Sequence, residues 1–264
     1  MARASVPTRT QPYWTDTLSE IALHAATLIA SFFQAVTGVG FGMIAGPVVL
    51  VVMNDPAAVV ISTCMSWLIS IVLFPFLRRG TDLGMLARLA TGAVIGLPAG
   101  LWLLGQADIA ELKLMAGIVI GVSTFAMVFG LPGTKKPGLA GDLIFGGLGG
   151  LFGGCLAMPG PTAAIRMSGL GHDKAKVRAT MVSFFFVVWP MIFMGQWATA
   201  GITSQTMWNA LGLVPATLAG IVIGNAVAAR LSERFFRRLV IGVLVVTSAS
   251  LLADAALNGL GGTP

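Results

Sequence analysis

The chain has 264 residues, of which 56% are hydrophobic and only 10% charged, and its formal net charge is +6. A soluble globular domain usually carries about 25% charged residues, so the composition excludes that class. The mean hydropathy is +0.90, and at least six apolar runs reach the roughly 20 residues that cross a bilayer. We therefore expect a polytopic integral membrane protein whose partner is the lipid bilayer. Because Lys and Arg lie between the apolar runs and form no basic face with interleaved aromatic residues, we expect no nucleic-acid partner.

Residues 1–17 form a polar N-terminal tail that lacks the pattern of a cleavable signal sequence. An apolar run without Lys or Arg follows at 18–53, and its centre reads TGVGFGMIAGP. One continuous membrane helix is not expected here, because a glycine inside a helix costs about 1 kcal/mol relative to alanine. We predict instead a helical hairpin over 18–53 that is broken near its glycines.

The remaining apolar runs are separated by short polar stretches. In chain order they predict spans at 57–77, 84–104 and 112–131, a second broken hairpin at 141–170, spans at 177–198, 207–229 and 236–256, and a C-terminal tail at 258–264. The second hairpin resembles the first because its glycine-rich segment, GGLGGLFGGCLAMPGP, also contains a proline shortly after the glycines.

Internal similarity divides the chain into two halves, 18–134 and 135–257. A shift of 112 positions lays Pro47 on Pro159, and a shift of 117 lays Thr63 on Thr180 within the segments STCMS and ATMVS. Other short matches follow in the same order, as two homologous halves with loop insertions would give.

The distribution of Lys and Arg predicts how the halves are oriented. If each broken segment crossed the membrane once, the basic residues would divide 7 against 9 between the two sides. If each broken segment is a hairpin, they divide 13 against 3, which the positive-inside rule favours. The predicted fold is therefore an all-α polytopic membrane protein with two inverted-topology repeats, each a glycine-broken helical hairpin plus three transmembrane helices. Both termini would lie outside, and the hairpins would meet near the midplane.

The two broken segments also predict where a substrate binds. Irregular backbone at membrane depth is tolerated only where protein buries it or where it lines a cavity, and paired broken helices indicate a transporter's binding site. Half-helices that start near Phe41 and Cys155 would direct their positive ends at an anion. The candidate substrate-binding residues are these glycines and the polar residues near them: Gln34, Thr37, Gly38, Gly40, Gly42, Thr63, Ser66, Gly153, Gly154, Thr180, Ser183 and Asn225.

Other interpretations of these residues stay open. Glycines four apart also allow close helix packing, which is the favoured interpretation for Gly92 with Gly96 and for Gly220 with Gly224. Membrane serines and threonines often bond to their own helix backbone, and large amides often join helices. Arg178 is either an orientation signal or part of a basic funnel that concentrates anions at the inner mouth.

Enzyme chemistry is not expected. No carboxylate lies inside a predicted span, and His24 and His172 are the two histidines. These residues form neither a metal-ligand cluster nor a paired general acid and base, so we predict no metal and no cofactor. Cys64 and Cys155 fit small apolar core residues. His24 is the one candidate for proton coupling within the membrane, and we expect an ordinary helix histidine there.

The paired GxGxG…P segments, together with KVRATMVS at Lys176–Ser183, resemble the sulfite exporter TauE/SafE family, also called the 4-toluene sulfonate uptake permeases. The resemblance extends from about residue 20 to 255. It implies a transporter of small sulfur-containing anions such as sulfite or sulfonates in the bacterial cytoplasmic (inner) membrane. The second half departs from the first, since Gly40 aligns with Phe152 and Gly46 with Met158, which leaves open whether both hairpins contribute equally.

Export is the favoured direction, because the inside-negative potential favours anion exit by about 2.3 kcal/mol per charge per 100 mV. The alternatives are a channel-type anion facilitator, in which glycine-lined loops form a filter, and an uptake permease for a small carboxylate or sulfonate. An assembly factor without a substrate and a homo-oligomeric state also stay open.

Overall fold

The computed structural model describes residues 17–38, 40–129, 138–200 and 202–228, together with isolated helical residues between 241 and 253. The predictions for the two tails, for the position of both termini and for most of the span at 236–256 lie outside these residues. Within the described ranges every regular element is a helix. The helices are α1 (Thr17–Thr37), α2 (Phe41–Met53), α3 (Ala57–Leu77), the 3₁₀ turn η1 (Arg78–Gly80), α4 (Leu83–Gln106), α5 (Ile109–Phe129), α6 (Leu139–Leu156), α7 (Gly160–Gly169), α8 (Lys174–Ala200) and α9 (Ser204–Val227).

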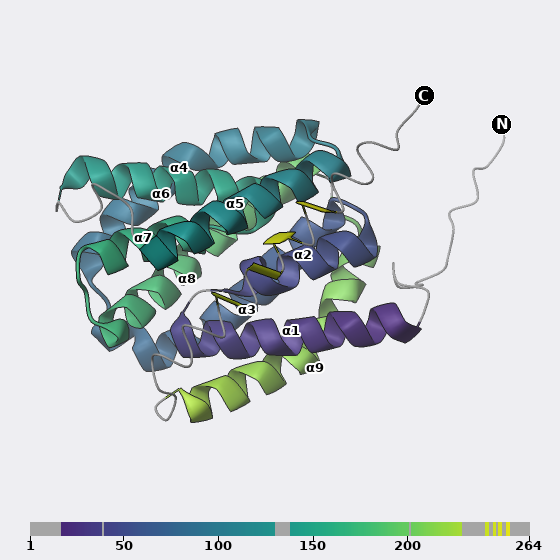
Figure 1. The fold of residues 1–264 in the computed structure, drawn as a ribbon, viewed down its shortest axis with the longest axis horizontal. Coiled ribbons are helices and arrows are strands. Elements are labelled where there is room, and N and C mark those ends of the chain that lie inside the picture. The colour runs from purple at the N-terminus through teal and green to yellow at the C-terminus, as the bar shows by residue number, and fades with distance from the viewer. Residues whose placement is uncertain are drawn as a thin grey trace.

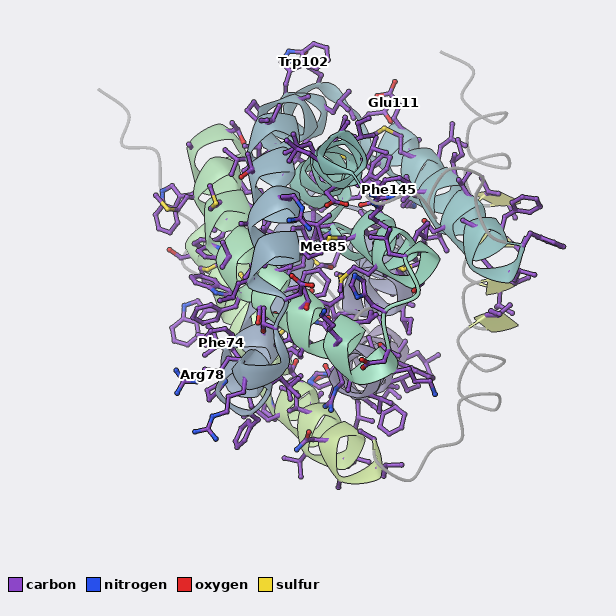
Figure 2. All side chains as sticks on the ribbon, turned by 90° about the vertical axis from the view of Figure 1, so that its left-hand side faces the viewer. Phe74, Arg78, Met85, Trp102, Glu111 and Phe145 are labelled. Carbon is purple, nitrogen blue, oxygen red and sulfur yellow. The ribbon has the colours of Figure 1, made fainter. Side chains whose placement is uncertain are left out.

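In the described part of the chain, seven helices are long and apolar enough to cross a membrane. The helix α2 has 13 residues and α7 has 10, so they extend only about 20 and 15 Å against a hydrocarbon core of about 30 Å. Side chains project from the outside of the bundle all the way round (Figure 2), and large apolar ones such as Trp102 are 64% exposed. This apolar exterior is the surface of an integral membrane protein.

The helices are arranged in three groups (Figure 1). The pair α4 and α6 lies along one side, the pair α1 and α9 lies along the other, and α2, α3 and α8 lie between them, while α5 packs mainly against α2 and α7. The closest helix pairs join the two halves of the sequence, because α4 packs most extensively on α6, α1 on α9, and α3 on α8. Between α3 and α8 the rings of Phe74 and Phe186 stack with their centroids 4.1 Å apart. If α1 is equivalent to α6 and α4 is equivalent to α9, the pair α4–α6 corresponds to the pair α9–α1. Homologous halves would require this correspondence.

Glycines on both helices allow α4 and α6 to touch through their backbones. A Cβ atom on Gly96 would overlap the carbonyl oxygen of Gly147, and one on Gly150 would overlap that of Ala93. Small residues four apart form such contacts between membrane helices. The packing interpretation of the glycines at 92 and 96 is therefore confirmed.

Glycine contacts of the same kind join α1 to α9. A Cβ atom on Gly220 would overlap the carbonyl oxygen of Leu28, and one on Gly224 would lie 2.6 Å from that of Phe32. The contacts advance by four residues on each helix, so α1 and α9 run parallel. The packing interpretation is confirmed here too, and α1 is held to the second half of the chain over much of its length.

Both predicted hairpins are present as two helices joined by a break. The first break is at Gly38 to Gly40, and these two glycines have φ angles of +81° and +134°. The second break follows Ala157, whose φ is +55°. The prediction that the second half-helix starts near Cys155 is wrong, because α6 continues to Leu156. The glycines before this point stay helical since they pack against α4, whereas the proline at 159 cannot donate a helical hydrogen bond.

The 112-residue shift between the hairpins is also wrong. It equates Pro47, which lies inside α2, with Pro159, which directly precedes α7. The breaks coincide instead when Gly38 is laid on Ala157, the two residues with left-handed backbone at the end of each long helix. Glycine and proline positions alone give the wrong register between the two hairpins, because these residues occur at packing contacts as well as at helix breaks.

The two hairpins open toward opposite ends of the molecule. At the end of α2, Asn54 Oδ1 accepts a hydrogen bond from Lys113 Nζ at 2.9 Å, near the start of α5. Near the start of α6, Asp142 is paired with Arg88 of the early α4 at 2.6 Å. Since α4 ends where α5 starts, these contacts lie at opposite ends of α4, and the tips of the hairpins point toward each other. The inverted-repeat arrangement of the two halves stays a prediction.

The predicted orientation is testable by labelling from the two sides of the membrane. We expect Gly80→Cys to react with an impermeant maleimide only from the cytoplasmic side, and Gln106→Cys only from outside, because both positions are exposed at opposite ends of α4. The background protein has Cys64 and Cys155 replaced by alanine. Labelling of intact spheroplasts and of inverted vesicles distinguishes the sides, and the reverse pattern would show that the assignment is wrong.

Candidate functional site

The two breaks meet in the interior of the protein. A Cβ atom on Gly42, in the first turn of α2, would overlap the carbonyl oxygen of Ala157 in the second break, and one on Gly46 would lie 3.3 Å from Met158 Cε. A small cavity with room for about one water molecule surrounds this contact. Its walls come from both breaks and from α3 and α8: Gln34, Gly40, Phe41, Gly42, Met43, Ser66, Ala157, Met158, Pro159, Gly160, Pro161, Phe185 and Trp189.

Gln34 holds the first break together. Its Oε1 accepts a hydrogen bond from the Phe41 N–H at 3.3 Å, and its Nε2 donates to the Ser66 carbonyl at 3.5 Å. The side chain is buried, so its amide fixes the end of α1 to the start of α2 and to α3. A glutamine at membrane depth therefore has a structural role here in addition to lining the cavity.

Two helices begin at the cavity. The first turn of α2, at Phe41, Gly42 and Met43, lines one wall, and Gly160 at the start of α7 lines another. The first N–H groups of a helix have no carbonyl partner inside the helix, and the helix dipole adds a positive potential there. Two such ends beside one space are a favourable environment for an anion.

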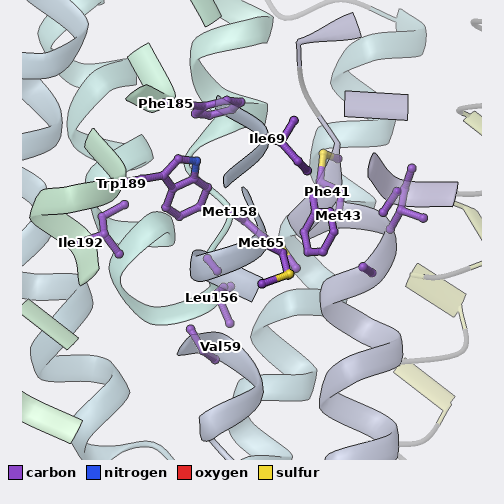
Figure 3. Packing of buried hydrophobic residues seen from close by; sticks show 14 of the residues in the cluster. Phe41, Met43, Val59, Met65, Ile69, Leu156, Met158, Phe185, Trp189 and Ile192 are labelled. Atoms are coloured by element: carbon purple, nitrogen blue, oxygen red, sulfur yellow. The ribbon is translucent and has the colours of Figure 1, made fainter. Parts of the chain in front are cut away.

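Two further donors at the cavity are unsatisfied. The hydroxyl of Ser66 and the indole N–H of Trp189 are buried, and neither has a hydrogen-bond partner among the described residues. Leaving a buried donor unpaired costs about 1–3 kcal/mol. Trp189 and Phe185 of α8 lie across from Phe41 and Met43 of α2 (Figure 3). Both groups are therefore free to donate a hydrogen bond to an acceptor placed in this space.

The other side chains around the cavity are apolar or polar but uncharged, as far as the described residues show. Phe41, Met43, Met158 and Phe185 close the space so tightly that it has room for about one water molecule. Positive potential at the cavity therefore comes from backbone groups and neutral donors.

The structure brings together four of the candidate residues, Gln34, Gly40, Gly42 and Ser66, at this cavity. It places the other eight elsewhere: Thr37, Gly38, Thr63, Gly153, Gly154, Thr180, Ser183 and Asn225. Thr37 and Thr63 donate to their own helix, to Phe33 O at 2.7 Å and to Val59 O at 3.0 Å, as threonines in membrane helices often do.

Thr180 and Ser183 bind the link between η1 and α4. The Thr180 hydroxyl accepts from the Asp82 N–H at 2.9 Å, and the Ser183 and Thr81 hydroxyls lie 2.6 Å apart. Asp82 also pairs with Lys176 at 3.0 Å. The Met85 N–H and the Lys176 ammonium hold the pKa of the Asp82 carboxyl below its usual value. The hydroxyls of the matched pair Thr63 and Thr180 thus both form hydrogen bonds to the protein backbone.

The remaining candidates have packing or capping roles. A Cβ atom on Gly154 would lie 3.0 Å from the backbone of Gly100 on α4, and one on Gly153 would lie 2.7 Å from Ile192 Cδ1 on α8. Asn225 Oδ1 accepts a hydrogen bond from Arg178 at 3.1 Å. These residues position the hairpins without lining the cavity.

Sequence reasoning missed Trp189 and the second break from Ala157 to Pro161. An indole N–H within an otherwise apolar span usually needs a partner, so Trp189 was recognisable in principle. The break was hidden because the glycine run before it favoured Gly153 and Gly154 as its position. Backbone contacts with α4, which no single sequence reveals, decide that those glycines stay helical.

A buried ion cluster anchors the second hairpin. Asp142 of α6 pairs with Arg166 of α7 at 2.8 Å and with Arg88 of α4 at 2.6 Å. Arg166 is 1% exposed and also donates to the Gly138 carbonyl at 3.3 Å. Removing one partner of a buried ion pair leaves an uncompensated charge, so this cluster fixes α6 and α7 to α4.

Two broken hairpins that present helix N-termini at one buried cavity are typical of secondary membrane transporters. The family model described as sulfite exporter TauE/SafE matches residues 23–251. The chain belongs to this family, which confirms the resemblance found in its sequence. Comparison with curated proteins and with solved structures finds no match.

Proposed function

We propose that the protein transports small sulfur-containing anions, such as sulfite or organic sulfonates, and binds them in the cavity between the two helix breaks. The observation that supports this most directly is the pair of unsatisfied donors, Ser66 Oγ and Trp189 Nε1, beside the start of α2. Membership of the TauE/SafE family supports the same class of substrate.

The chemistry of these anions fits the donors. Sulfite and sulfonates present three oxygen atoms around one sulfur, so donors that converge on one point from different helices can each bind an oxygen. Ser66 lies on α3, Trp189 on α8, and the N–H groups of Gly42 and Met43 on α2. Neutral donors in place of a fixed charge bind the anion firmly enough for selection while still allowing its release.

A carrier is favoured over a channel. The cavity has room for about one water molecule, so a sulfur oxyanion fits only if the walls of the cavity move apart. Such movement from one side and then the other is the alternating access expected of inverted hairpins. A channel would need a continuous polar path, and the walls of this cavity are mainly apolar.

Transport driven by the membrane potential is favoured over transport coupled to protons. His24 Nδ1 bonds to the Glu20 carbonyl of its own helix at 2.9 Å. It lies ten residues before Gln34 on α1, about 15 Å along the helix from the cavity. In a bacterial cytoplasmic membrane the inside-negative potential is sufficient to expel an anion.

Flux in proteoliposomes tests this function. We expect a potassium gradient with valinomycin to drive sulfite or sulfoacetate away from the negative side without a pH gradient, because the transported species carries the charge. The flux is expected to saturate, to show counterflow, and to persist in His24→Gln. Scintillation counting or an enzymatic sulfite assay measures it.

Each alternative function predicts a different result in the same flux experiments. Flux that ignores the potential, follows a pH gradient and disappears in His24→Gln would establish proton coupling. Flux without saturation or counterflow would establish a channel. No flux of sulfite, sulfonates or small carboxylates in protein that is correctly inserted would favour an assembly factor.

A further inference from the structure

A helix break exposes two opposite potentials at one place. The helix that follows the break contributes its positive N-terminus, and the helix that precedes it contributes the negative end of its own dipole. At the first break these are the start of α2 and the end of α1. The carbonyls in the last turn of α1 would therefore oppose the binding of an anion unless they are neutralised.

Arg178 of α8 lies on this negative end. Its Nε donates to the carbonyl of Ala35, in the last turn of α1, at 2.8 Å. Its backbone lies so close to the break that a Cβ atom on Gly38 would be 2.9 Å from the Arg178 carbonyl oxygen. A cation bound to the orphan carbonyls at a helix C-terminus compensates the dipole there.

Arg178 does not line the cavity. Arg178, Phe185 and Trp189 lie at positions that share one face of α8, but seven and eleven residues correspond to about 10 and 16 Å along the helix. The guanidinium is also bound to Asn225 Oδ1 at 3.1 Å. Arg178 can therefore affect the anion through its field and through the end of α1.

The second break has a weaker counterpart. Gln196 Nε2, also on α8, donates to the Gly154 carbonyl at the end of α6 at 3.3 Å. This donor is a neutral amide, whereas Arg178 has a full charge. The two hairpins thus differ, because the negative dipole end at the first break is bound by a charged side chain and the one at the second break by a neutral side chain.

We propose that Arg178 is the positioning residue that makes the first break electropositive, and that it thereby favours anions of higher charge at the transport site. The proposal rests on the proposed function, since it concerns the same cavity. It assigns Arg178 a role different from an orientation signal or an entry funnel.

Comparing ligands of different charge distinguishes an electrostatic role of Arg178 from a merely structural one. Electrostatic energy is proportional to the charge of the anion. In Arg178→Gln we expect binding of methanesulfonate, a monovalent anion, to weaken about three- to tenfold, and binding of divalent sulfite at alkaline pH to weaken by about the square of that factor. Isothermal titration of the purified protein measures both, and Arg178→Lys should recover most of the loss.

The matched control is Lys176→Gln. Lys176 is on the same helix end and has the same charge, but it pairs with Asp82 and not with the break. We expect it to change both affinities less than twofold. In Asn225→Asp, a carboxylate replaces the amide beside the guanidinium while Arg178 stays in place, so the same charge-dependent loss is expected. This variant decides the question if Arg178→Gln does not fold.

Equal weakening of both anions in Arg178→Gln and Asn225→Asp would overturn the proposal, and so would the same charge-dependent loss in Lys176→Gln. Wild-type protein that binds neither anion would instead overturn the proposed function. The two failures are therefore distinguishable in one set of titrations.

Discussion

Replacing Trp189 by phenylalanine is expected to weaken anion binding about ten- to hundredfold. The indole N–H is a free buried donor at the cavity, and a hydrogen bond to a charged acceptor contributes about 1.5–3 kcal/mol. Phenylalanine keeps most of the apolar contacts but cannot donate. We expect Ser66→Ala to have a similar effect, and titration of purified protein with sulfite measures both.

Trp197→Phe is the matched control. Trp197 lies on the same helix and is 59% exposed, so the loss of its N–H is expected to leave affinity unchanged. The melting temperature of Trp189→Phe should equal or exceed that of the wild type, because an unpaired buried donor has been removed. Unchanged affinity in Trp189→Phe and Ser66→Ala would show that the anion does not bind in this cavity.

Replacing Gly150 by valine is expected to destabilise the fold strongly. A Cβ atom at this position would overlap the Ala93 carbonyl oxygen, and backbone atoms of α4 cannot move aside without separating the two helices. Overpacking a well-packed core typically costs about 1–3 kcal/mol, and a clash with backbone is at the upper end of that range. The monodisperse fraction after solubilisation and the melting temperature measure the loss.

Gly212→Val is the control for this variant. Gly212 is a helical glycine of α9, and among the described residues no atom outside its own helix backbone lies within 4 Å of the place that a Cβ atom would take, so valine should be tolerated there. A folded Gly150→Val protein with wild-type thermal stability would contradict the contact between α4 and α6. The same contact predicts that bulk at Gly154 damages folding as well as transport, since Gly154 also faces α4.

A third glycine, Gly40, allows the effect of a substitution on function to be separated from its effect on folding. Gly40 has a φ of +134°, which an L residue rarely adopts, but a Cβ atom there would have its nearest neighbour 3.8 Å away. Gly40→Ala therefore strains the first break without a clash between helices. This difference between Gly40 and Gly150 could not be read from the sequence, where both are glycines in apolar segments.

The sequence alone determined the membrane class, the place of both hairpins and the described spans, because these depend on local properties. Hydropathy over about 20 residues decides whether a segment enters the bilayer, and clustered glycines lower the intrinsic helix propensity of a segment. The predicted span at 57–77 coincides with α3, and the family resemblance found in the sequence agrees with the family-model match over residues 23–251.

Only the tertiary structure decided which polar and glycine residues reach the cavity. Thr180 and Ser66 are both small hydroxyl residues in apolar helices, yet Thr180 binds the backbone of Asp82 while Ser66 is left unpaired at the cavity. Gly42 touches the second break and Gly154 touches α4. The reason is physical: the partner of a side chain depends on which helices meet and in which register, and contacts between distant segments set both.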